Sequence, residues 1–242
     1  EKPAYIVNQV CGSGLRSIIS GFQSINSGGS KIIIAGGQES MSMSPHAIHL
    51  RDGKKLGDVE VVDTMIKDGL WDAFHGYHMG VTAENVATKF QVTRQEQDKF
   101  ALSSQVKALK AQKENKFKEE IVNFKIKSKK AEIDFKKDEH PREGIDIETL
   151  KKLKPVFQKD GTVTAGNSSG INDGAAAVVL MPDDEANKRG LNKLVTIKSW
   201  ASCGVDPSLM GTGPIPASKK ALELSGWSVK DLDILEVNEA FA

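Results

Sequence analysis

The first forty residues contain two apolar runs with one helical pattern between them. Residues 5–10 form an apolar run typical of a strand, and apolar residues then recur at helical spacing from Leu15 to Ile25. Gly28 and Gly29 end the predicted helix, and residues 31–35 form a second, β-branched run. A strand, a helix and a buried strand in succession predict an α/β unit built on a parallel sheet.

The pattern changes between about residues 43 and 169, where loops, charged helices and a lysine-rich stretch replace the regular alternation. Within this part, Thr93 and Glu96 are spaced as a capping box, which predicts the start of a helix. We expect this helix to turn three apolar side chains inward: Phe100, Val106 and Leu109. The lysines between residues 107 and 137 alternate with acids and predict a solvated surface, with phosphate binding as the alternative.

The same patterns predict further elements along the chain. They are a half-buried strand at 121–127, a buried strand at 176–181, a helix from Pro182 to Gly190, a strand at 194–198, a helix from Pro216 to Leu224 and a strand at 232–237. Because regular alternation returns after residue 170, the middle of the chain resembles an insertion between two parts of one sheet.

Composition narrows the class of protein. The hydrophobic share of 39% in 242 residues allows a sizeable core, and a net charge of +1 gives no reason to expect a nucleic-acid or membrane partner. With only Cys11 and Cys203 and no secretory leader, we expect a reducing, cytoplasmic compartment. Both ends fall inside apolar patterns, so we also expect an internal piece of a longer protein.

Cys11 is the first candidate for chemistry. Residues 8–14, Asn-Gln-Val-Cys-Gly-Ser-Gly, place this cysteine where the first predicted strand turns into the first helix. The unpaired N–H groups and positive end of a helix favour an anion there, and therefore the reactive thiolate. The alternative is a small buried side chain, which is what most free cysteines are. Cys203 lacks the helix-initiating context and is interpreted as structural.

Other candidates are weaker when taken singly. His75 and His78 are spaced to share a metal ion, but no cysteine or carboxylate cluster completes the set, so we expect no metal site. Arg142 has a guanidinium that suits both ring stacking and phosphate binding, although an exposed arginine without a role is the alternative. Asn238 follows an apolar run, where it either caps an element or serves chemistry.

Taken together, several of these stretches resemble motifs of the thiolase family, and they occur in the family's order. The matching stretches are residues 8–14 around the cysteine, Tyr-His-Met-Gly at 77–80, His-Pro-Arg-Glu-Gly at 140–144, the small-residue loop at 160–175, Met-Gly-Thr-Gly-Pro-Ile-Pro at 210–216 and Asn-Glu-Ala-Phe-Ala at 238–242. This resemblance covers the whole chain.

The resemblance implies an α/β thiolase fold, a layered α-β-α-β-α sandwich of two similar halves with an inserted loop domain. Residues 1–42 and 171–192 would form part of the N-terminal half, residues 43–170 the loop domain that binds coenzyme A, and residues 193–242 an incomplete C-terminal half.

The resemblance also implies residue roles. Cys11 is the expected nucleophile, acylated by an acyl-CoA, and Asn238 is expected to hold a water in an oxyanion hole. The expected substrate and coenzyme A contacts are Leu70, His78, Met79, Arg142, Phe157, Ala165, Ser169, Gly170, Met210, Ala240 and Phe241. The family also uses a His in a Gly-His-Pro motif and a Cys in a Cys-x-Gly motif, which we expect beyond residue 242; without them this polypeptide alone would be catalytically impaired.

The implied reaction is that of an acetyl-CoA C-acetyltransferase, which condenses two acetyl-CoA into acetoacetyl-CoA. Coenzyme A thioesters are expected as substrates, with no separate cofactor, and the expected assembly is a homodimer or a dimer of dimers, that is, a homotetramer. The alternatives are a degradative 3-ketoacyl-CoA thiolase, a condensing enzyme that uses acyl carrier protein, and a coenzyme A-binding homologue without chemistry.

Overall fold

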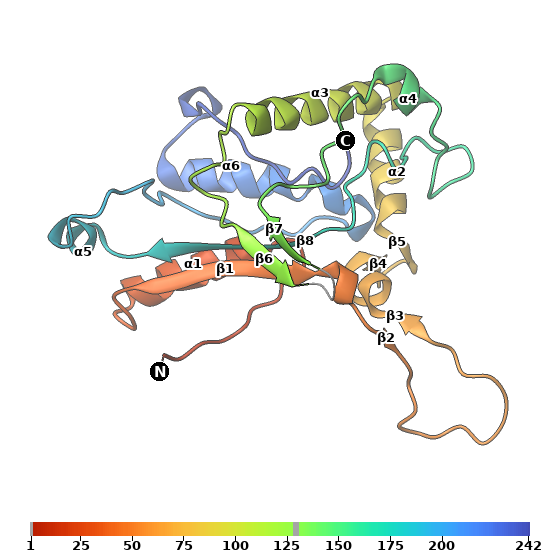
Figure 1. Ribbon diagram of the computed structural model, residues 1–242, viewed down its shortest axis with the longest axis horizontal. Helices are drawn as coiled ribbons and strands as arrows, with labels where there is room; N and C mark the ends of the chain where they lie inside the picture. The colour runs from red at the N-terminus through yellow and green to blue at the C-terminus, as the bar shows by residue number, and fades with distance from the viewer. Residues whose placement is uncertain (1, 128–130) are drawn as a thin grey trace. The chain divides into compact units, whose positions relative to one another are not determined.

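The computed structural model describes residues 2–127 and 131–242, and these form two compact units (Figure 1). The first unit combines Glu1–Gly76, Ile171–Val205 and Thr212–Leu235, and the second combines Tyr77–Gly170, Asp206–Gly211 and Glu236–Ala242. The helices are α1 Ser13–Asn26, α2 Met79–Phe90, α3 Arg94–Lys113, α4 Ile147–Lys151, α5 Asp183–Lys188 and α6 Pro214–Ser225. The short helical turns are η1 Met41–Met43, η2 Met65–Leu70, η3 Pro207–Thr212 and η4 Val229–Asp231.

The strands are mostly short and pair as antiparallel ribbons. They are β1 Ile33–Ser40, β2 His46–Ala47, β3 Val62–Asp63, β4 Trp71–Asp72, β5 Tyr77–His78, β6 Phe124–Lys127, β7 Glu132–Phe135 and β8 Asp173–Leu180. The longest ribbon pairs β1 with β8, so that segments far apart in the sequence lie side by side. The pairs β2–β3 and β6–β7 are antiparallel as well. No helix of the described residues is both long and apolar enough to cross a membrane.

In the first unit, α1 lies against one face of the β1–β8 ribbon (Figure 1). The two elements meet at Gly21, which is buried; a Cβ there would lie 2.8 Å from Leu180 Cδ1 and 3.2 Å from Ile33 Cγ2. The helix therefore needs glycine at this point to approach the ribbon closely. The opposite face of the ribbon is open in this chain, where Ile34 is 76% and Val179 is 59% exposed.

Several predicted helices are confirmed. The helix after Cys11 spans Ser13–Asn26 and ends before Gly28, whose φ of +77° only glycine adopts readily. Helix α5 follows Pro182 and ends before Gly190. Helix α6 begins two residues earlier than predicted, at Pro214, because either proline suits the first turn of a helix.

The expected parallel sheet at the start of the chain is wrong. Residues 5–10 form no extended strand, and β1 pairs with β8 in antiparallel register. The predicted strands at 194–198 and 232–237 are also not formed. A strand requires a neighbour that accepts its backbone hydrogen bonds, and these runs pair with no strand of the described chain. They are largely exposed: Ile6 is 96%, Leu194 is 94% and Ile234 is 80% exposed.

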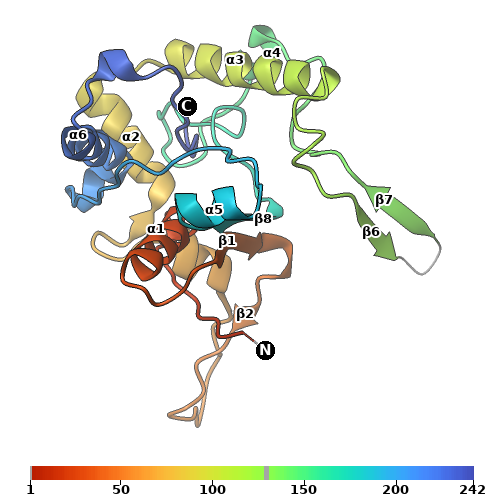
Figure 2. The same ribbon diagram turned by 90° about the vertical axis from the view of Figure 1, so that its left-hand side faces the viewer.

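The second unit is built on α2, α3 and α4, and a hairpin of β6 and β7 projects from it beyond the end of α3 (Figure 2). We predicted a half-buried strand at 121–127, but β6 starts at Phe124 and every residue of the hairpin's strands is exposed. The alternation of apolar and polar residues therefore predicted the strand correctly, but the prediction that one of its faces is buried is wrong. The described lysines between 107 and 137 are exposed, as predicted.

Helix α3 begins with the predicted capping box. The Glu96 N–H donates to Thr93 Oγ1 at 3.2 Å, and the Thr93 N–H donates to Glu96 Oε2 at 2.7 Å. The buried face of this helix differs from the prediction, because Phe100 and Val106 are about half exposed while Gln97, Asp98 and Ala101 are buried. Polar side chains occupy the inner face because they hold a neighbouring loop by hydrogen bonds, described below.

Replacing Thr93 with Ala should lower the free energy of unfolding by about 1 kcal/mol, since the backbone N–H of Glu96 loses its acceptor. Chemical denaturation of the full-length protein measures this change. The matched control is Gln95→Ala, an exposed position in the same helical turn, which should leave stability close to that of the wild type. Equal midpoints for the Thr93 and Gln95 variants would contradict the cap's contribution.

Candidate active site

Cys11 is exposed and lies immediately before α1. The N-cap residue is Gly12, and no side chain caps this end of the helix. The Gly12 and Ser13 N–H groups donate to the Gln9 and Val10 carbonyls at 3.0 and 3.1 Å, so it is chiefly the positive end of the helix that favours an anion here. The predicted position of the cysteine at a helix N-terminus is confirmed, although the strand expected before it is not formed.

The turn before Cys11 is conformationally strained. Val10 has a φ of +48°, which lies in the left-handed region that β-branched residues rarely adopt and which costs on the order of 1–3 kcal/mol. Two side chains hold it there: Asn8 Oδ1 accepts the Val10 N–H at 2.9 Å, and the Ser13 hydroxyl donates to the Val10 carbonyl at 2.7 Å. The residues around the cysteine thus fix the backbone that presents it.

Arg16 extends this local network along α1. Its Nε donates to Gln9 Oε1 at 2.8 Å and a terminal guanidinium nitrogen donates to Ser202 Oγ at 3.1 Å. The Gln9 N–H also donates to Ser13 Oγ at 2.8 Å. The polar residues flanking Cys11 therefore form hydrogen bonds that stabilise the turn. These roles were not predicted from the sequence, although asparagine and serine side chains are a known signal of such turns.

Alkylation by iodoacetamide should distinguish the two cysteines. We expect Cys11 to react faster than Cys203, because Cys11 is exposed while Cys203 is partly buried. Peptide mapping by mass spectrometry after short exposure of the full-length protein measures both rates, and urea-unfolded protein is the control in which the difference should vanish. Equal rates in the folded protein would show that the turn does not present Cys11 to solvent.

In the second unit, three predicted substrate contacts lie together as aromatic rings. His78 stacks on Phe157 with ring centroids 4.6 Å apart, and Phe157 meets Phe241 edge to face at 6.2 Å. Gly80, at the start of α2, makes room for this stack, since a Cβ there would overlap the Phe157 ring. The structure therefore places these three candidates side by side, within one unit.

His78 is both a ring in this stack and the N-cap of α2. Its Nδ1 accepts the Gly80 N–H at 3.0 Å, so the neutral ring carries its proton on Nε2. Burial lowers the pKa of His78 below its ordinary value of 6.5, because it disfavours the charged imidazolium. At neutral pH this side chain is therefore an uncharged hydrogen-bond donor through Nε2.

The lowered pKa makes part of the protein's stability depend on pH. Below about pH 6.5 the unfolded chain binds a proton at this histidine more readily than the folded chain does, so stability falls as pH falls through this range. His78→Asn keeps a capping oxygen but does not titrate. Between about pH 7.5 and pH 5.5, we expect the melting temperature of the wild type to fall further than that of this variant; parallel decreases would contradict the assignment.

A buried carboxylate holds the small-residue loop at 160–170. Glu84, on α2, is 4% exposed, and its oxygens accept the Thr162 N–H at 2.8 and 2.9 Å, the Thr162 hydroxyl at 2.8 Å and the Val163 N–H at 2.8 Å. Hydrogen bonds to this many donors compensate the cost of burying the carboxylate. Gln97 adds a bond from its Nε2 to Thr162 Oγ1 at 2.8 Å.

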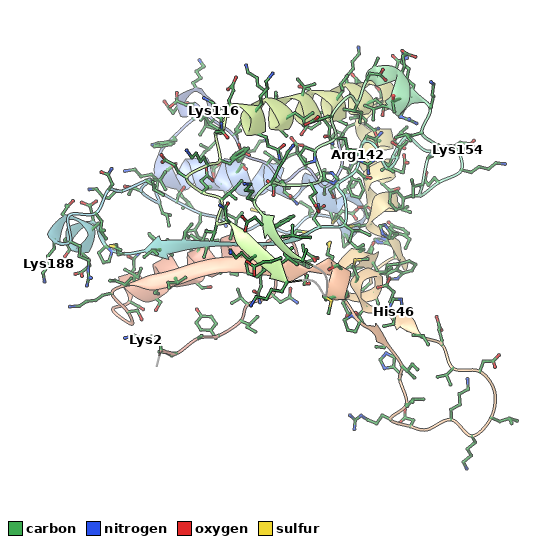
Figure 3. All side chains as sticks on the ribbon, viewed as in Figure 1. Lys2, His46, Lys116, Arg142, Lys154 and Lys188 are labelled. Carbon is green, nitrogen blue, oxygen red and sulfur yellow. The ribbon has the colours of Figure 1, made fainter. Side chains whose placement is uncertain are left out.

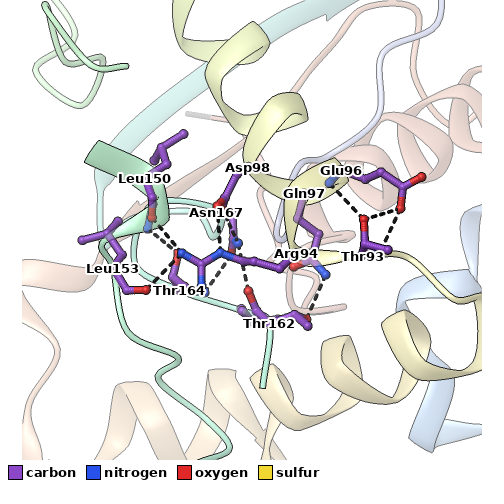
Figure 4. A network of polar contacts seen from close by, with 12 residues as sticks. Thr93, Arg94, Glu96, Gln97, Asp98, Leu150, Leu153, Thr162, Thr164 and Asn167 are labelled. Carbon is purple, nitrogen blue, oxygen red and sulfur yellow. Dashed lines mark hydrogen bonds and ion pairs between the residues drawn. The ribbon is translucent and has the colours of Figure 1, made fainter. Parts of the chain in front are cut away.

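A second buried cluster reaches the same loop from α3 (Figure 4). Arg94 Nε donates to Asp98 Oδ2 at 2.8 Å, and a terminal guanidinium nitrogen donates to the Leu150 and Leu153 carbonyls. Asn167 Nδ2 donates to Asp98 Oδ1 at 3.0 Å. The loop is therefore held from α2 by Glu84 and from α3 by Asp98. We named neither residue from the sequence, where buried acids look the same as exposed ones.

The Asn-Glu-Ala-Phe-Ala segment pairs with this loop. The Ser169 N–H donates to the Ala240 carbonyl at 2.9 Å, the Ala242 N–H donates to the Asn167 carbonyl at 2.8 Å, and Phe241 forms a bridge with Ser168. Two predicted contact regions that are distant in sequence, residues 165–170 and 240–241, are therefore neighbours within the second unit.

The remaining candidates are placed as follows. In the second unit, Met79 is the first residue of α2 and is half-buried, while Met210 lies in η3 and is 38% exposed. Arg142 is exposed, and its backbone N–H donates to Gln105 Oε1. Ala165 and Asn238 are exposed, and Gly170 is half-buried. Leu70, half-buried at the end of η2, belongs with Cys11 to the first unit. Figure 3 labels Arg142 and also Lys154, whose exposed side chain extends outward from the loop after α4.

A surface cavity of about 180 Å³ adjoins the loop in the second unit. It is lined by residues of α3, by His140 and Pro141, by residues 166–169, and by Glu239 and Ala242. Of the predicted contacts, Ser169 contributes to its wall. Within the described ranges, no group of three or more His, Cys, Asp or Glu side chains could hold a metal ion.

Comparison of the sequence with models of known protein families identifies the family of this chain. The family model "Thiolase, N-terminal domain" matches residues 1–184, and "Thiolase, C-terminal domain" matches residues 191–242. The chain belongs to the thiolase family. The resemblance read from the motifs is confirmed over the whole chain.

Individual thiolases are similar in sequence. An acetyl-CoA acetyltransferase of Rhizobium meliloti (strain 1021) is 59% identical over 242 residues, which cover 100% of this chain and 62% of that protein. A cytosolic acetyl-CoA acetyltransferase of Rattus norvegicus is 52% identical and covers 99% of this chain and 61% of its own length. The chain thus spans about 62% of the length of the curated thiolases it matches.

Solved thiolases confirm the fold class. The acetyl-CoA acetyltransferase of Bacillus anthracis superposes with a TM-score of 0.95 at 46% identity, over 98% of this chain and 60% of that chain. Human mitochondrial 3-ketoacyl-CoA thiolase also has a TM-score of 0.95, at 43% identity, over 99% of this chain and 61% of that chain. The domain boundaries and residue roles that the resemblance implies remain predictions.

Proposed function

We propose that the protein is an acetyl-CoA C-acetyltransferase that uses Cys11 as its nucleophile. The observation that carries this proposal is the presentation of Cys11: an exposed thiol before an uncapped helix, behind a strained turn at Val10. Backbone strain of this kind persists only where surrounding contacts enforce it, and it is concentrated at functional sites. Membership of the thiolase family supports the same role.

The proposed reaction has two steps. The Cys11 thiolate attacks the carbonyl carbon of acetyl-CoA, the bond from that carbon to the coenzyme A sulfur breaks, and an acetyl-Cys remains while coenzyme A leaves as a thiol after taking up a proton. A base, which the thiolase resemblance assigns to a cysteine in a Cys-x-Gly motif, then takes a proton from the methyl group of a second acetyl-CoA, and the resulting enolate carbon attacks the acetyl-Cys carbonyl. The bond to the Cys11 sulfur breaks and acetoacetyl-CoA is released.

Negative charge develops on a thioester oxygen in both steps, and the proposal assigns donors to it. The backbone N–H of Cys11, at the positive end of α1, suits one such oxygen, and a water held by Asn238 would serve another. Donors already placed for the developing charge typically contribute about 3 kcal/mol each to lowering the barrier. The fixed turn at Val10 supports the first of these assignments.

The second unit offers the surface for the thioester arm. His78, Phe157 and Phe241 form an apolar wall, to which His78 adds an Nε2–H donor. Ser169 and Ala240 lie beside it on the paired loop and C-terminal segment. We assign the other predicted contacts, Leu70, Met79, Arg142, Ala165, Gly170 and Met210, to the same substrate.

An acetyl substrate is preferred over a longer acyl chain. Curated relatives at 59% and 52% identity carry the name acetyl-CoA acetyltransferase; of the two solved thiolases, the acetyl-CoA acetyltransferase is 46% identical and the 3-ketoacyl-CoA thiolase 43%. The backbone alone does not discriminate, because both solved thiolases superpose equally well. We therefore expect side chains, and not the backbone, to set the chain length of the acyl group.

The proposal includes coenzyme A thioesters as substrates and no separate cofactor. It also includes a cytoplasmic location, which the cytosolic rat relative supports, and a homodimer or homotetramer as the assembly.

The first test is mass spectrometry of the intact full-length protein after brief exposure to acetyl-CoA. We expect one acetyl group, mapped to Cys11, because the thioester carbonyl reacts with an activated thiolate. Cys11→Ala should abolish the adduct, whereas the matched control Cys203→Ala should retain it. Absence of an adduct on a folded wild type that binds coenzyme A would refute the nucleophile and favour a non-catalytic coenzyme A-binding protein.

A further inference from the structure

Asn167 is almost fully buried, at 3% exposure, and its side chain links three separate backbone or carboxylate groups. Its Nδ2 donates to Asp98 Oδ1 and to the Thr162 carbonyl, both at 3.0 Å, and its Oδ1 accepts the Thr164 N–H at 2.7 Å. An amide is the side chain that supplies donors and an acceptor at once, so this pattern needs asparagine and not aspartate.

The backbone of Asn167 holds a different segment. Its carbonyl accepts the Ala242 N–H at 2.8 Å, and two residues later the Ser169 N–H donates to the Ala240 carbonyl at 2.9 Å. These bonds fix residues 240–242 against the loop, two residues beyond Asn238. One residue therefore connects the buried side-chain cluster of α3 to the segment that carries Asn238.

At the α3 end of this connection, Asp98 is held by further hydrogen bonds. Asp98 is 1% exposed and accepts Arg94 Nε at 2.8 Å, while Arg94 also donates to two carbonyls at the end of α4. Buried networks whose members are all bonded rigidify the structure around them. The position of Asn167 is thus set by α3 as well as by the loop on which it lies.

We propose that Asn167 is a positioning residue, which fixes residues 240–242 through the Asp98 cluster and thereby sets where Asn238 lies. This inference rests on the proposed function, in which Asn238 holds a water against the developing oxyanion. Asn167 itself does not touch the substrate in this proposal. Its contribution is to keep the oxyanion donor within the narrow distance at which it stabilises the transition state.

Asn167→Asp in the full-length protein tests this proposal. The variant keeps the shape and the acceptor for Thr164, but places a second carboxylate oxygen against Asp98. Misplacement of a catalytic group by about 1 Å costs up to roughly a hundred-fold in rate, so we expect kcat to fall by about ten- to a hundred-fold. KM for acetyl-CoA should change less than kcat, because the bound ground state makes little use of the oxyanion donor.

A compensating variant tests the mechanism of the effect. In Asp98→Asn combined with Asn167→Asp, the amide and the carboxylate exchange places, so a donor again faces an acceptor while an oxygen remains for Arg94. We expect this double variant to recover part of the lost kcat, although the Thr162 carbonyl still lacks its donor. A double variant no faster than Asn167→Asp would overturn the proposal.

Hydrogen exchange provides a measurement that is independent of activity. We expect the Ser169 and Ala242 amides to exchange faster in Asn167→Asp, since these are the bonds that hold the segment. The matched control is Ser199→Ala, which removes the hydrogen bond from the Ser199 hydroxyl to the Ala221 carbonyl in the first unit and lowers stability without touching this cluster. It should keep kcat and the exchange of these two amides unchanged; equal effects in both variants would mean that Asn167 is merely structural.

The two proposals fail in different ways. If the wild type forms no acetyl adduct at Cys11, the proposed function fails whatever the exchange data show. If the wild type is acetylated but Asn167→Asp retains its kcat, or loses only affinity for acetyl-CoA, the positioning role is refuted while the function stands.

Discussion

The second unit depends on buried acids that are bonded to backbone N–H groups and to an amide. Glu84 and Asp98 come from two different helices, yet both hold the loop at 160–170. A loop rich in small residues has few apolar side chains to bury and loses much conformational entropy when it is ordered. Charge-assisted hydrogen bonds in a water-poor interior offset that cost, which explains why the inner face of α3 is polar.

In the first unit, hydrogen bonds from exposed side chains hold a strained turn in place. Cys11 is exposed, so packing around its own side chain does not hold it in place. Its backbone is fixed from both sides instead, by Asn8 before it and Ser13 after it, with Val10 in the left-handed region. Buried hydrogen bonds thus order the backbone of the loop in the second unit, and exposed hydrogen bonds order the backbone around Cys11 in the first.

The features that depend on local chemistry could be predicted from the sequence. The helix after Cys11, the capping box at Thr93 and Glu96, and the glycine and proline boundaries of α1, α5 and α6 were predicted, because caps and turns depend on residues within a few positions. Strand partners were predicted poorly. The run at 5–10 and the pairing of β1 depend on which distant strand supplies hydrogen bonds, and no local pattern records that.

By itself, the sequence determined the family, the helices α1, α3, α5 and α6, and the identity of Cys11 as the candidate nucleophile, since motifs in a fixed order are a property of the chain. Only the tertiary structure decided that β1 pairs antiparallel with β8, that Phe100 is exposed while Asp98 is buried, and that Asn167 joins the loop to residues 240–242. The physical reason is range. Burial and hydrogen-bond partners are set by contacts between residues far apart in sequence, such as Asp98 and Asn167, and these contacts exist only once the chain has folded.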